Sequence, residues 1–368
     1  MNTAAALEPR AHMRSVIARI ATGPEYSKDI SAEEARDAMR AILDNHADPV
    51  QAGIFFIALR MKRETDDENI GVLDAIMEVT QSATAQADEV ALLADPYDGY
   101  NRSLTAAPFL PALLAACGLP TVSTGVESMG PKYGATHRQI LRAAGINVDL
   151  TPAEAAARMN GAGWAYCDQS RFAPKLHDLT GLRTTIIKRP VLTTVEVLLA
   201  PVKGAKKTHF ITGYVHKPYP RVYALLARHA GFDDSLIIRG TEGGVIPSLR
   251  QDSRMFVVHD RGAEQQVEIS PKALGIEQEV RAPLIPGMDE ASELEAHVEA
   301  FDAGRVSALA AEAGLAALNG EKGAAYDSLV LGAAIMLHGL KKADSIAAGA
   351  DMARKALDCG AAKARFAA

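Results

Sequence analysis

Basic side chains are concentrated in one part of the chain. Between Leu179 and Phe232 there are nine lysine and arginine residues and a single acid, Glu196. The whole chain has a formal net charge of −6, so the remainder must carry a clear excess of carboxylates. Such asymmetry suits a protein in which one face meets phosphate groups. The nine cations are Arg183, Lys188, Arg189, Lys203, Lys206, Lys207, Lys217, Arg221 and Arg228.

Ring side chains lie among these cations. Tyr214, Tyr219 and Tyr223 can stack on bases while lysine and arginine follow a phosphate backbone, and nearby histidines add charge below about pH 6.5. Three interpretations stay open: a nucleic-acid face, a solvated surface, and a basic pocket for a small anion. The tyrosines also suit half-buried core positions. The first interpretation assigns nucleic-acid binding to Lys188, Arg189, Lys203, Lys206, Lys207, Lys217, Arg221 and Arg228.

A polar loop precedes a helix that we expect over residues 104–117. The loop contains Gly99, Asn101, Arg102 and Ser103. Free N–H groups and the dipole at a helix start favour a bound phosphate. The loop also follows an expected strand, and open α/β sheets bind ligands at the carboxyl ends of their strands. Turn and capping chemistry explains the same residues equally well.

The sequence does not assemble a nucleophile, a base and an orienting group. His177 beside Asp178, and His216 near Tyr219, are compatible with structural or phosphate-facing roles. There is no Ser-His-Asp signature, Walker loop or G-x-G-x-x-G segment. The three cysteines lack the spacing of metal ligands. We therefore assign no catalytic residue and no metal site.

Length and composition fit an ordinary globular protein. The 368 residues allow two domains, and 48% of them are apolar. The first 20 residues lack the apolar core of a signal peptide. The longest nearly apolar stretch, residues 106–120, is interrupted by Pro108 and Pro111 and is too short to cross a bilayer. We expect a cytoplasmic protein without a membrane segment.

The elements change character along the chain. The first 80 residues predict helices, with capping boxes at Ser31 and Thr65. The run 52–59 is apolar nearly all round, which is typical of a buried helix or a subunit contact. Beyond residue 88, strands alternate with helices, which predicts a mostly parallel sheet. We expect strands at 90–94, 121–123, 164–167, 209–211, 236–238 and 255–258, helices near 104–117, 136–144, 152–160 and 220–230, and mainly helix over 289–359.

Four passages resemble anthranilate phosphoribosyltransferase and its relatives in glycosyltransferase family 3. Residues 56–65 are similar to the family's "ALR-x-KGET", and residues 95–126 occupy the place of its glycine-rich phosphate loop. Residues 238–243 are similar to "HG-x-DG", and residues 320–337 to the closing helix. The resemblance covers residues from about 14 to 345.

This resemblance implies a fold and its boundaries. We expect an α/β protein of the class of anthranilate phosphoribosyltransferase and pyrimidine nucleoside phosphorylase. A small N-terminal helical domain would span residues 10–80, with a returning segment near 170–200. A larger α/β domain with a mostly parallel sheet would span residues 88–360. A cleft between the domains would hold the ligand.

The resemblance also implies ligand-binding positions. The family's second loop, roughly K-H-G-N-R-S, falls on residues 123–128, which makes Thr124, Gly125 and the nearby Lys132 candidates. Thr241 and Glu242 follow the strand of the third passage. Arg183, in a segment similar to "LG-x-RT", is a candidate for a carboxylate, phosphate or base contact. An interdomain salt bridge is its alternative role.

Three loops depart from the family pattern. Residues 95–101 replace a run of roughly G-T-G-G-D-G, and their proline removes a donor while two aspartates add negative charge. The second loop lacks the family's lysine and arginine. The Asp-Glu pair that would hold Mg²⁺ is replaced by Val245 and Ile246, which offer no oxygen ligand. These departures predict weak or absent phosphoribosyl pyrophosphate chemistry.

The loops resemble most those of nucleic-acid-binding proteobacterial paralogues of the family. The features that carry it are the loop Pro96-Tyr-Asp-Gly99, which is similar to the paralogues' Pro-x-Tyr-x-Gly, and the Gly-Thr-Glu-Gly segment. This resemblance implies a homodimer that binds single-stranded nucleic acid or nucleotides, with no cofactor. The alternative is a pentosyl or phosphoribosyl transferase that acts on an aromatic or nucleobase acceptor. That enzyme would require Mg²⁺ if its donor were phosphoribosyl pyrophosphate.

Overall fold

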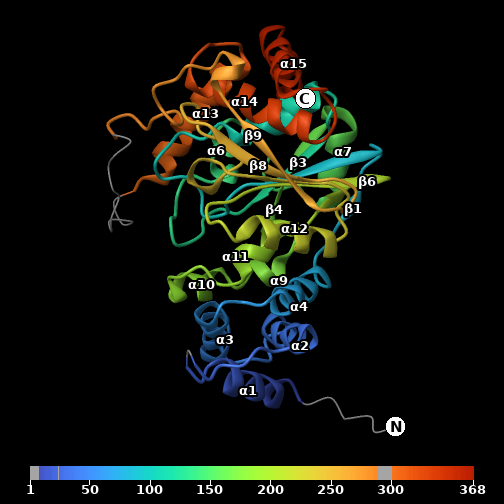
Figure 1. The fold of residues 1–368 in the computed structure, drawn as a ribbon, viewed down its shortest axis with the longest axis vertical. Helices are drawn as coiled ribbons and strands as arrows, with labels where there is room; N and C mark the ends of the chain where they lie inside the picture. The colour runs from blue at the N-terminus through green and yellow to red at the C-terminus, as the bar shows by residue number, and fades with distance from the viewer. Residues whose placement is uncertain (1–7, 24, 289–300) are drawn as a thin grey trace. The chain divides into compact units, whose positions relative to one another are not determined.

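The computed structural model describes residues 8–23, 25–288 and 301–368 (Figure 1). These residues form two compact units. The helical unit contains the described residues up to Gln81 together with Ala173–Leu199, and the α/β unit contains Ser82–Phe172 and Ala200–Ala368. The predicted fold class, a helical N-terminal part and a larger α/β part with a mostly parallel sheet, is confirmed. The part of the expected helical stretch at 289–300 lies outside the described residues.

Capped helices make up the helical unit. The capping boxes predicted at Ser31 and Thr65 are present, and Phe55 and Phe56 are fully buried in the core. The returning segment contributes helices that contact α3 and α4. The elements are α1 (Pro9–Ile20), α2 (Ala32–Leu43), α3 (Pro49–Lys62), α4 (Asp66–Met77), α9 (Pro174–His177), α10 (Thr180–Ile186), α11 (Leu192–Val195) and η2 (Glu196–Leu198).

A seven-stranded sheet forms the centre of the α/β unit, in the order β4-β3-β2-β6-β7-β8-β9. The first five strands in this order are parallel, and β8 and β9 continue the sheet antiparallel. A separate parallel pair joins β1 (Ala83–Thr84) to β5 (Val202–Lys203). The strands are β2 (Glu89–Ala94), β3 (Thr121–Gly125), β4 (Trp164–Asp168), β6 (Lys207–Gly213), β7 (Ser235–Ile238), β8 (Ser253–Val258) and β9 (Glu264–Ile269).

All six strands predicted from the sequence are present. The prediction missed the two-residue strands β1 and β5, and it missed β9, because the sequence Glu-Gln-Gln-Val-Glu-Ile has no apolar run. β9 is one of the two outer strands of the sheet. An outer strand is half solvated and therefore keeps polar side chains.

Helices cover both faces of the sheet (Figure 1). One face shares a large apolar core with α5, α13, α14, α15 and α16, and α12 covers the other through Tyr223, which packs on Phe210. No described helix has both the length and the apolarity to cross a membrane. The helices are η1 (Ala107–Phe109), α5 (Leu110–Ala116), α6 (His137–Ala143), α7 (Pro152–Ala162), α8 (Gln169–Phe172), α12 (Tyr219–His229), η4 (Lys272–Leu274), α13 (Ala303–Leu318), α14 (Ala324–Gly339), α15 (Ile346–Asp358) and α16 (Ala361–Ala367).

Strand direction gives the sheet two chemically distinct edges. We call the edge where β2, β3, β4, β6 and β7 end the carboxyl edge, and the edge where they begin the amino edge. Because β8 is antiparallel, its first residues lie at the carboxyl edge. A strand of seven residues such as β6 separates the two edges by about 20 Å.

Candidate anion-binding site at the carboxyl edge

A buried carboxylate organises the loop that follows β2. Oδ2 of Asp95 accepts a hydrogen bond from the Tyr100 hydroxyl (2.7 Å) and lies 2.8 Å from Nε2 of His137. Its Oδ1 accepts from the backbone N–H of Val245 (3.0 Å). Burial, followed by the nearby Asp95 charge, raises the pKa of Tyr100 well above its ordinary value. Asp95 is 1% exposed, so its charge ties three segments together inside the unit.

The negative charges expected to repel an anion are both engaged. Asp95 is enclosed as described, and Asp98 is buried with its Oδ1 3.4 Å from Nζ of Lys132. The same Nζ donates to the carbonyl oxygens of Gly99 (2.8 Å) and Glu242 (3.1 Å). Asp95 is therefore enclosed by hydrogen-bond partners, and Lys132 offsets the charge of Asp98.

Glu242 occupies the donors of the predicted phosphate loop. Its Oε2 accepts from the backbone N–H of Asn101 (3.1 Å). Its Oε1 accepts from the backbone N–H of Arg102 (3.3 Å) and the hydroxyl of Ser103 (2.7 Å). Successive donors of this kind form an anion-binding concavity, called a nest. We use "the nest" for the two N–H groups and the hydroxyl of residues 101–103.

Two glycines allow the loops to approach each other this closely. A Cβ atom on Gly244 would lie 1.7 Å from the Tyr100 hydroxyl oxygen, and one on Gly213 would lie 2.1 Å from the carbonyl oxygen of Gly243. Both distances are far inside van der Waals contact, so no other residue fits at these positions without movement. The absence of a side chain at Gly244 therefore lets the 240–244 loop lie against the 95–103 loop, and its absence at Gly213 lets the end of β6 lie against the 240–244 loop.

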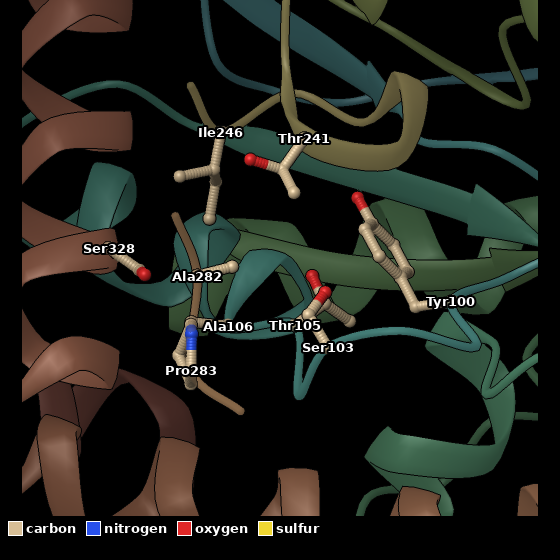
Figure 2. Close-up of a pocket in the computed structure, with 9 residues that line it drawn as sticks. All are labelled: Tyr100, Ser103, Thr105, Ala106, Thr241, Ile246, Ala282, Pro283 and Ser328. Carbon is tan, nitrogen blue, oxygen red and sulfur yellow. The ribbon is translucent and has the colours of Figure 1, made fainter. Parts of the chain in front are cut away.

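A small cavity adjoins the nest (Figure 2). Its volume of about 20 Å³ has room for a water molecule. Figure 2 shows the hydroxyl groups of Tyr100, Ser103, Thr105 and Thr241 around one part of it, with Ile246 above. Ala106, Ala282, Pro283 and Ser328 complete the lining.

The helix after the loop starts later than predicted. The first helical residue is Ala107, in the short turn η1, and the α-helix α5 begins at Leu110 rather than near 104. Thr105 already accepts a hydrogen bond from the Ala107 N–H. The donors of the nest consequently belong to the loop itself, and no helix N-terminus contributes to them.

The structure brings together seven of the predicted ligand-binding residues. Gly99, Asn101, Arg102, Ser103, Lys132, Thr241 and Glu242 all lie in or beside the nest. Thr124 and Gly125 end the neighbouring strand β3 and are buried. The Thr124 hydroxyl accepts a hydrogen bond from the Tyr97 hydroxyl (2.9 Å), so the end of β3 supports the 95–103 loop.

Arg183 lies in the helical unit and has an internal partner. Its Nη1 and Nη2 each lie 2.6 Å from a carboxylate oxygen of Glu196, and both side chains are buried. The two partners belong to the same unit, so this salt bridge is not an interdomain one. A two-point pair of this kind engages the N–H groups along the guanidinium edge that a carboxylate or phosphate ligand would need.

The basic stretch does not form one surface in the α/β unit. Lys203, Lys206, Lys207 and Arg228 lie at the amino edge, whereas Lys217 and Arg221 follow β6 at the carboxyl edge. Three of the four at the amino edge pair with acids: Lys206 with Asp88 (2.9 Å), Lys207 with Asp260 (3.3 Å) and Arg228 with Glu264 (3.2 Å). Lys188 and Arg189 belong to the helical unit.

Two of the three tyrosines cannot stack on bases. Tyr214 is 6% exposed and packs on Phe256, and Tyr223 is 8% exposed and packs on Phe210. Tyr219 is partly exposed and packs on Tyr223. The core interpretation of this spacing is therefore correct for Tyr214 and Tyr223.

Sequence reasoning missed two arginines at the carboxyl edge. Arg239 follows β7, Arg254 lies near the start of β8, and the Arg239 N–H donates to the Arg254 carbonyl (3.0 Å). Burial raises the pKa of Tyr214, the charges of Arg254 and Arg239 lower it, and that of Glu268 raises it. Both arginines lie outside the 179–232 stretch, and only the strand reversal at β8 brings them together.

The residues present do not fit the Mg²⁺ that the family resemblance implies. Val245 and Ile246, at the position of the metal-binding pair, are buried apolar side chains. The carboxylate of Glu242 is engaged by the nest, and Asp98 is paired with Lys132. Within the described ranges, no group of three or more His, Cys, Asp or Glu side chains is placed to hold a metal ion.

The fold defines a two-part protein with a candidate ligand site at the carboxyl ends of a largely parallel sheet. Residues 14–80 match the helical bundle domain of a glycosyl transferase family, and residues 95–363 match its α/β domain. The chain belongs to this glycosyl transferase family.

Individual relatives agree with this assignment. The chain is 26% identical over 354 residues to the anthranilate phosphoribosyltransferase of Rhodopseudomonas palustris (strain ATCC BAA-98 / CGA009), covering 96% of each chain. It is 29% identical to that of Azospirillum brasilense, covering 96% of this chain and 90% of the relative. An uncharacterized Aquifex aeolicus (strain VF5) protein is 30% identical over 250 residues, 68% of this chain and 74% of its own.

Solved structures share the fold. The anthranilate phosphoribosyltransferase from Thermus thermophilus superposes with a TM-score of 0.74 at 20% identity, covering 97% of both chains. The Saccharomyces cerevisiae enzyme, in complex with phosphoribosyl pyrophosphate and Mg, gives a TM-score of 0.76 at 14% identity, covering 97% of this chain and 96% of that one.

Proposed function

We propose that this family member is a dimeric protein that binds single-stranded nucleic acid or nucleotides through the carboxyl edge of its sheet. The observation that carries the proposal is that Lys217, Arg239 and Arg254 follow or begin strands at this edge. Within the described residues none of the three forms a salt bridge, although Glu268 is the cross-strand neighbour of Arg254. Oε1 of Glu268 accepts instead from Gln266 (2.6 Å).

Unpaired cations at a ligand-binding edge are the feature that phosphate recognition requires. Lysine and arginine that neutralise phosphates release counterions, which supplies most of the free energy of non-specific nucleic-acid binding. Carboxyl ends of parallel strands are also the usual ligand sites of open α/β sheets. The amino edge fits this role less well, because three of its four cations already have carboxylate partners.

Phosphoribosyl transfer is the less supported function. The relatives named anthranilate phosphoribosyltransferase make it the second candidate. However, the site lacks oxygen ligands at Val245 and Ile246, and Glu242 fills the donors that a pyrophosphate would use. If this chain is a transferase, it would have to act without the Asp-Glu pair that would hold Mg²⁺.

An exposed apolar surface on the helical unit supports the dimer. Val50 is 69% exposed and Met61 is 75% exposed, both on α3, and Ile54 between them is 41% exposed. They border a hollow of about 570 Å³ lined by residues of α1, α3 and α10. Apolar side chains gathered in this way are typical of protein contacts. Light scattering on the purified chain should give the mass of two copies, and a monomer would remove this part of the proposal.

Fluorescence anisotropy of a labelled single-stranded DNA oligomer tests the binding function. We expect saturable binding whose affinity falls steeply as the salt concentration rises. Stabilisation by phosphoribosyl pyrophosphate with Mg²⁺, measured as a rise in Tm, would instead favour the transferase. The absence of DNA binding at low salt would refute the proposal.

A further inference from the structure

The carboxylate of Glu242 stands where a ligand anion would stand. All three of its contacts are donors of the nest, and no lysine or arginine in the described residues forms a salt bridge with it. A carboxylate and a phosphate accept the same hydrogen bonds from backbone N–H groups and hydroxyls. The chain thus shows directly that the nest accepts an anion.

The backbone of Glu242 is held in an uncommon conformation. Its φ of 55° lies in the left-handed region, which residues other than glycine seldom adopt. The contacts of its side chain with the nest offset this strain. Loss of these contacts would free the 241–243 turn to move. The conformation of this turn and the presence of the Glu242 carboxylate in the nest therefore depend on each other.

The surroundings suit a larger anion than a carboxylate. Nζ of Lys132 contacts the Glu242 carbonyl oxygen and Asp98, so a cation stands beside the nest without pairing with the Glu242 carboxylate. On another side, the small cavity presents the hydroxyl of Thr241 (Figure 2), whereas the Tyr100 hydroxyl already donates to Asp95. A phosphate group has more acceptor oxygens than a carboxylate and can use these additional donors.

We infer that the nest is a phosphate-binding site that Glu242 keeps closed, and that a phosphate group of a ligand enters by displacing this carboxylate. The ligand class is a phosphate monoester or a pyrophosphate. The inference does not rest on nucleic-acid binding, because the contacts that support it are separate from Lys217, Arg239 and Arg254. It makes the native chain a weak phosphate binder whose affinity is set by an internal competitor.

Calorimetric titration with inorganic pyrophosphate tests this inference on the full chain. Glu242→Gln removes the charge and Glu242→Gly removes the whole side chain. Glycine also tolerates the left-handed turn, so the second variant guards against loss of folding. We expect both to bind pyrophosphate at least about tenfold more tightly than the native chain. Glu321→Gln, at an exposed position remote from the loop in sequence, is the matched control and should bind as the native chain does.

A second substitution locates the bound anion. Adding Ser103→Ala to Glu242→Gly removes a donor of the nest and should abolish most of the gain. If neither Glu242 variant binds more tightly than the native chain, the competitor role is wrong. If the gain survives Ser103→Ala unchanged, the anion binds elsewhere and the inference also fails. Either result leaves the DNA-binding assay unaffected, so the two proposals can fail separately.

Discussion

The two edges of the sheet use charge in opposite ways. At the amino edge, exposed lysines pair with exposed acids, as Lys206 does with Asp88 and Lys207 with Asp260. At the carboxyl edge, two acids point inward: Asp95 holds three segments and Glu242 fills the nest. A third acid, Glu268, is exposed opposite Arg254 but accepts a hydrogen bond from Gln266, and neither Arg239 nor Arg254 forms a salt bridge among the described residues.

This difference shows that the local density of cations is a poor guide to a binding surface. The amino edge has more lysines from the basic stretch, yet its acids neutralise most of them. The carboxyl edge has fewer, but the carboxylates of Asp95 and Glu242 there are engaged by hydrogen bonds within the unit. Net charge at a surface depends on where the acids go as much as on where the cations lie.

The largest expected effect concerns the two kinds of aspartate. Asp95→Asn should lower the free energy of unfolding by about 3 kcal/mol, because it leaves His137 and other buried groups without their charged partner. Asp260→Asn, at an exposed position of the amino edge, should leave it unchanged within error. Urea unfolding monitored by circular dichroism measures both. Equal effects of the two substitutions would contradict the distinction between inward and outward acids.

The next effect concerns the cations. The double substitution of Arg239→Ala and Arg254→Ala should raise the Kd for single-stranded DNA about tenfold, and lower the salt slope by about 1.4 if each arginine contacts one phosphate. Lys206→Ala with Lys207→Ala removes the same charge from the amino edge. We expect little change from this control in the same anisotropy titration. A larger effect from the lysine pair would reverse the assignment of the edges.

The smallest effect concerns a buried cluster at the amino edge. Nε2 of His209 lies 3.0 Å from Glu89 and Nδ1 lies 2.9 Å from Asp234. Burial raises the pKa of Asp234, but hydrogen bonds from His209 and from the Asp260 N–H outweigh it and hold this pKa below its ordinary value of 3.8.

A carboxyl group with a lowered pKa stabilises the folded state above its unfolded pKa, and this contribution is lost as the pH falls. Asp234→Asn should therefore destabilise the chain at pH 7, and the difference from the native chain should shrink as the pH falls below 3.8. Unfolding midpoints at pH 7, 5, 4 and 3 provide the measurement. A difference that stays constant over this range would show that the Asp234 charge contributes nothing.

Most of the fold could be predicted because its elements carry local signals. The capping boxes at Ser31 and Thr65 and the apolar runs of β2, β6 and β7 depend on neighbouring residues only. The late start of α5 could not be predicted, because the Leu104 N–H donates to Pro283, which lies far along the chain. The polar outer strand β9 also carries too weak a periodic signal.

The site could be predicted only in part. The loop residues were found because glycine, asparagine and serine after a strand are a recognisable pattern. Their actual partner, Glu242, lies about 140 residues away, and nothing local reveals that it fills the donors of the loop. The pairing of Arg183 with Glu196 and the proximity of Arg239 to Arg254 likewise depend on tertiary contacts.

The glycines around Glu242 have a consequence for how this edge can evolve. Gly213 and Gly244 hold the backbone frame by contacts that allow no side chain, whereas the group that fills the nest belongs to one residue. On the role inferred for Glu242, the two glycines maintain the backbone of the site and one side chain sets its occupancy. A single substitution at Glu242 would then change which anions this edge admits while the surrounding fold stays the same.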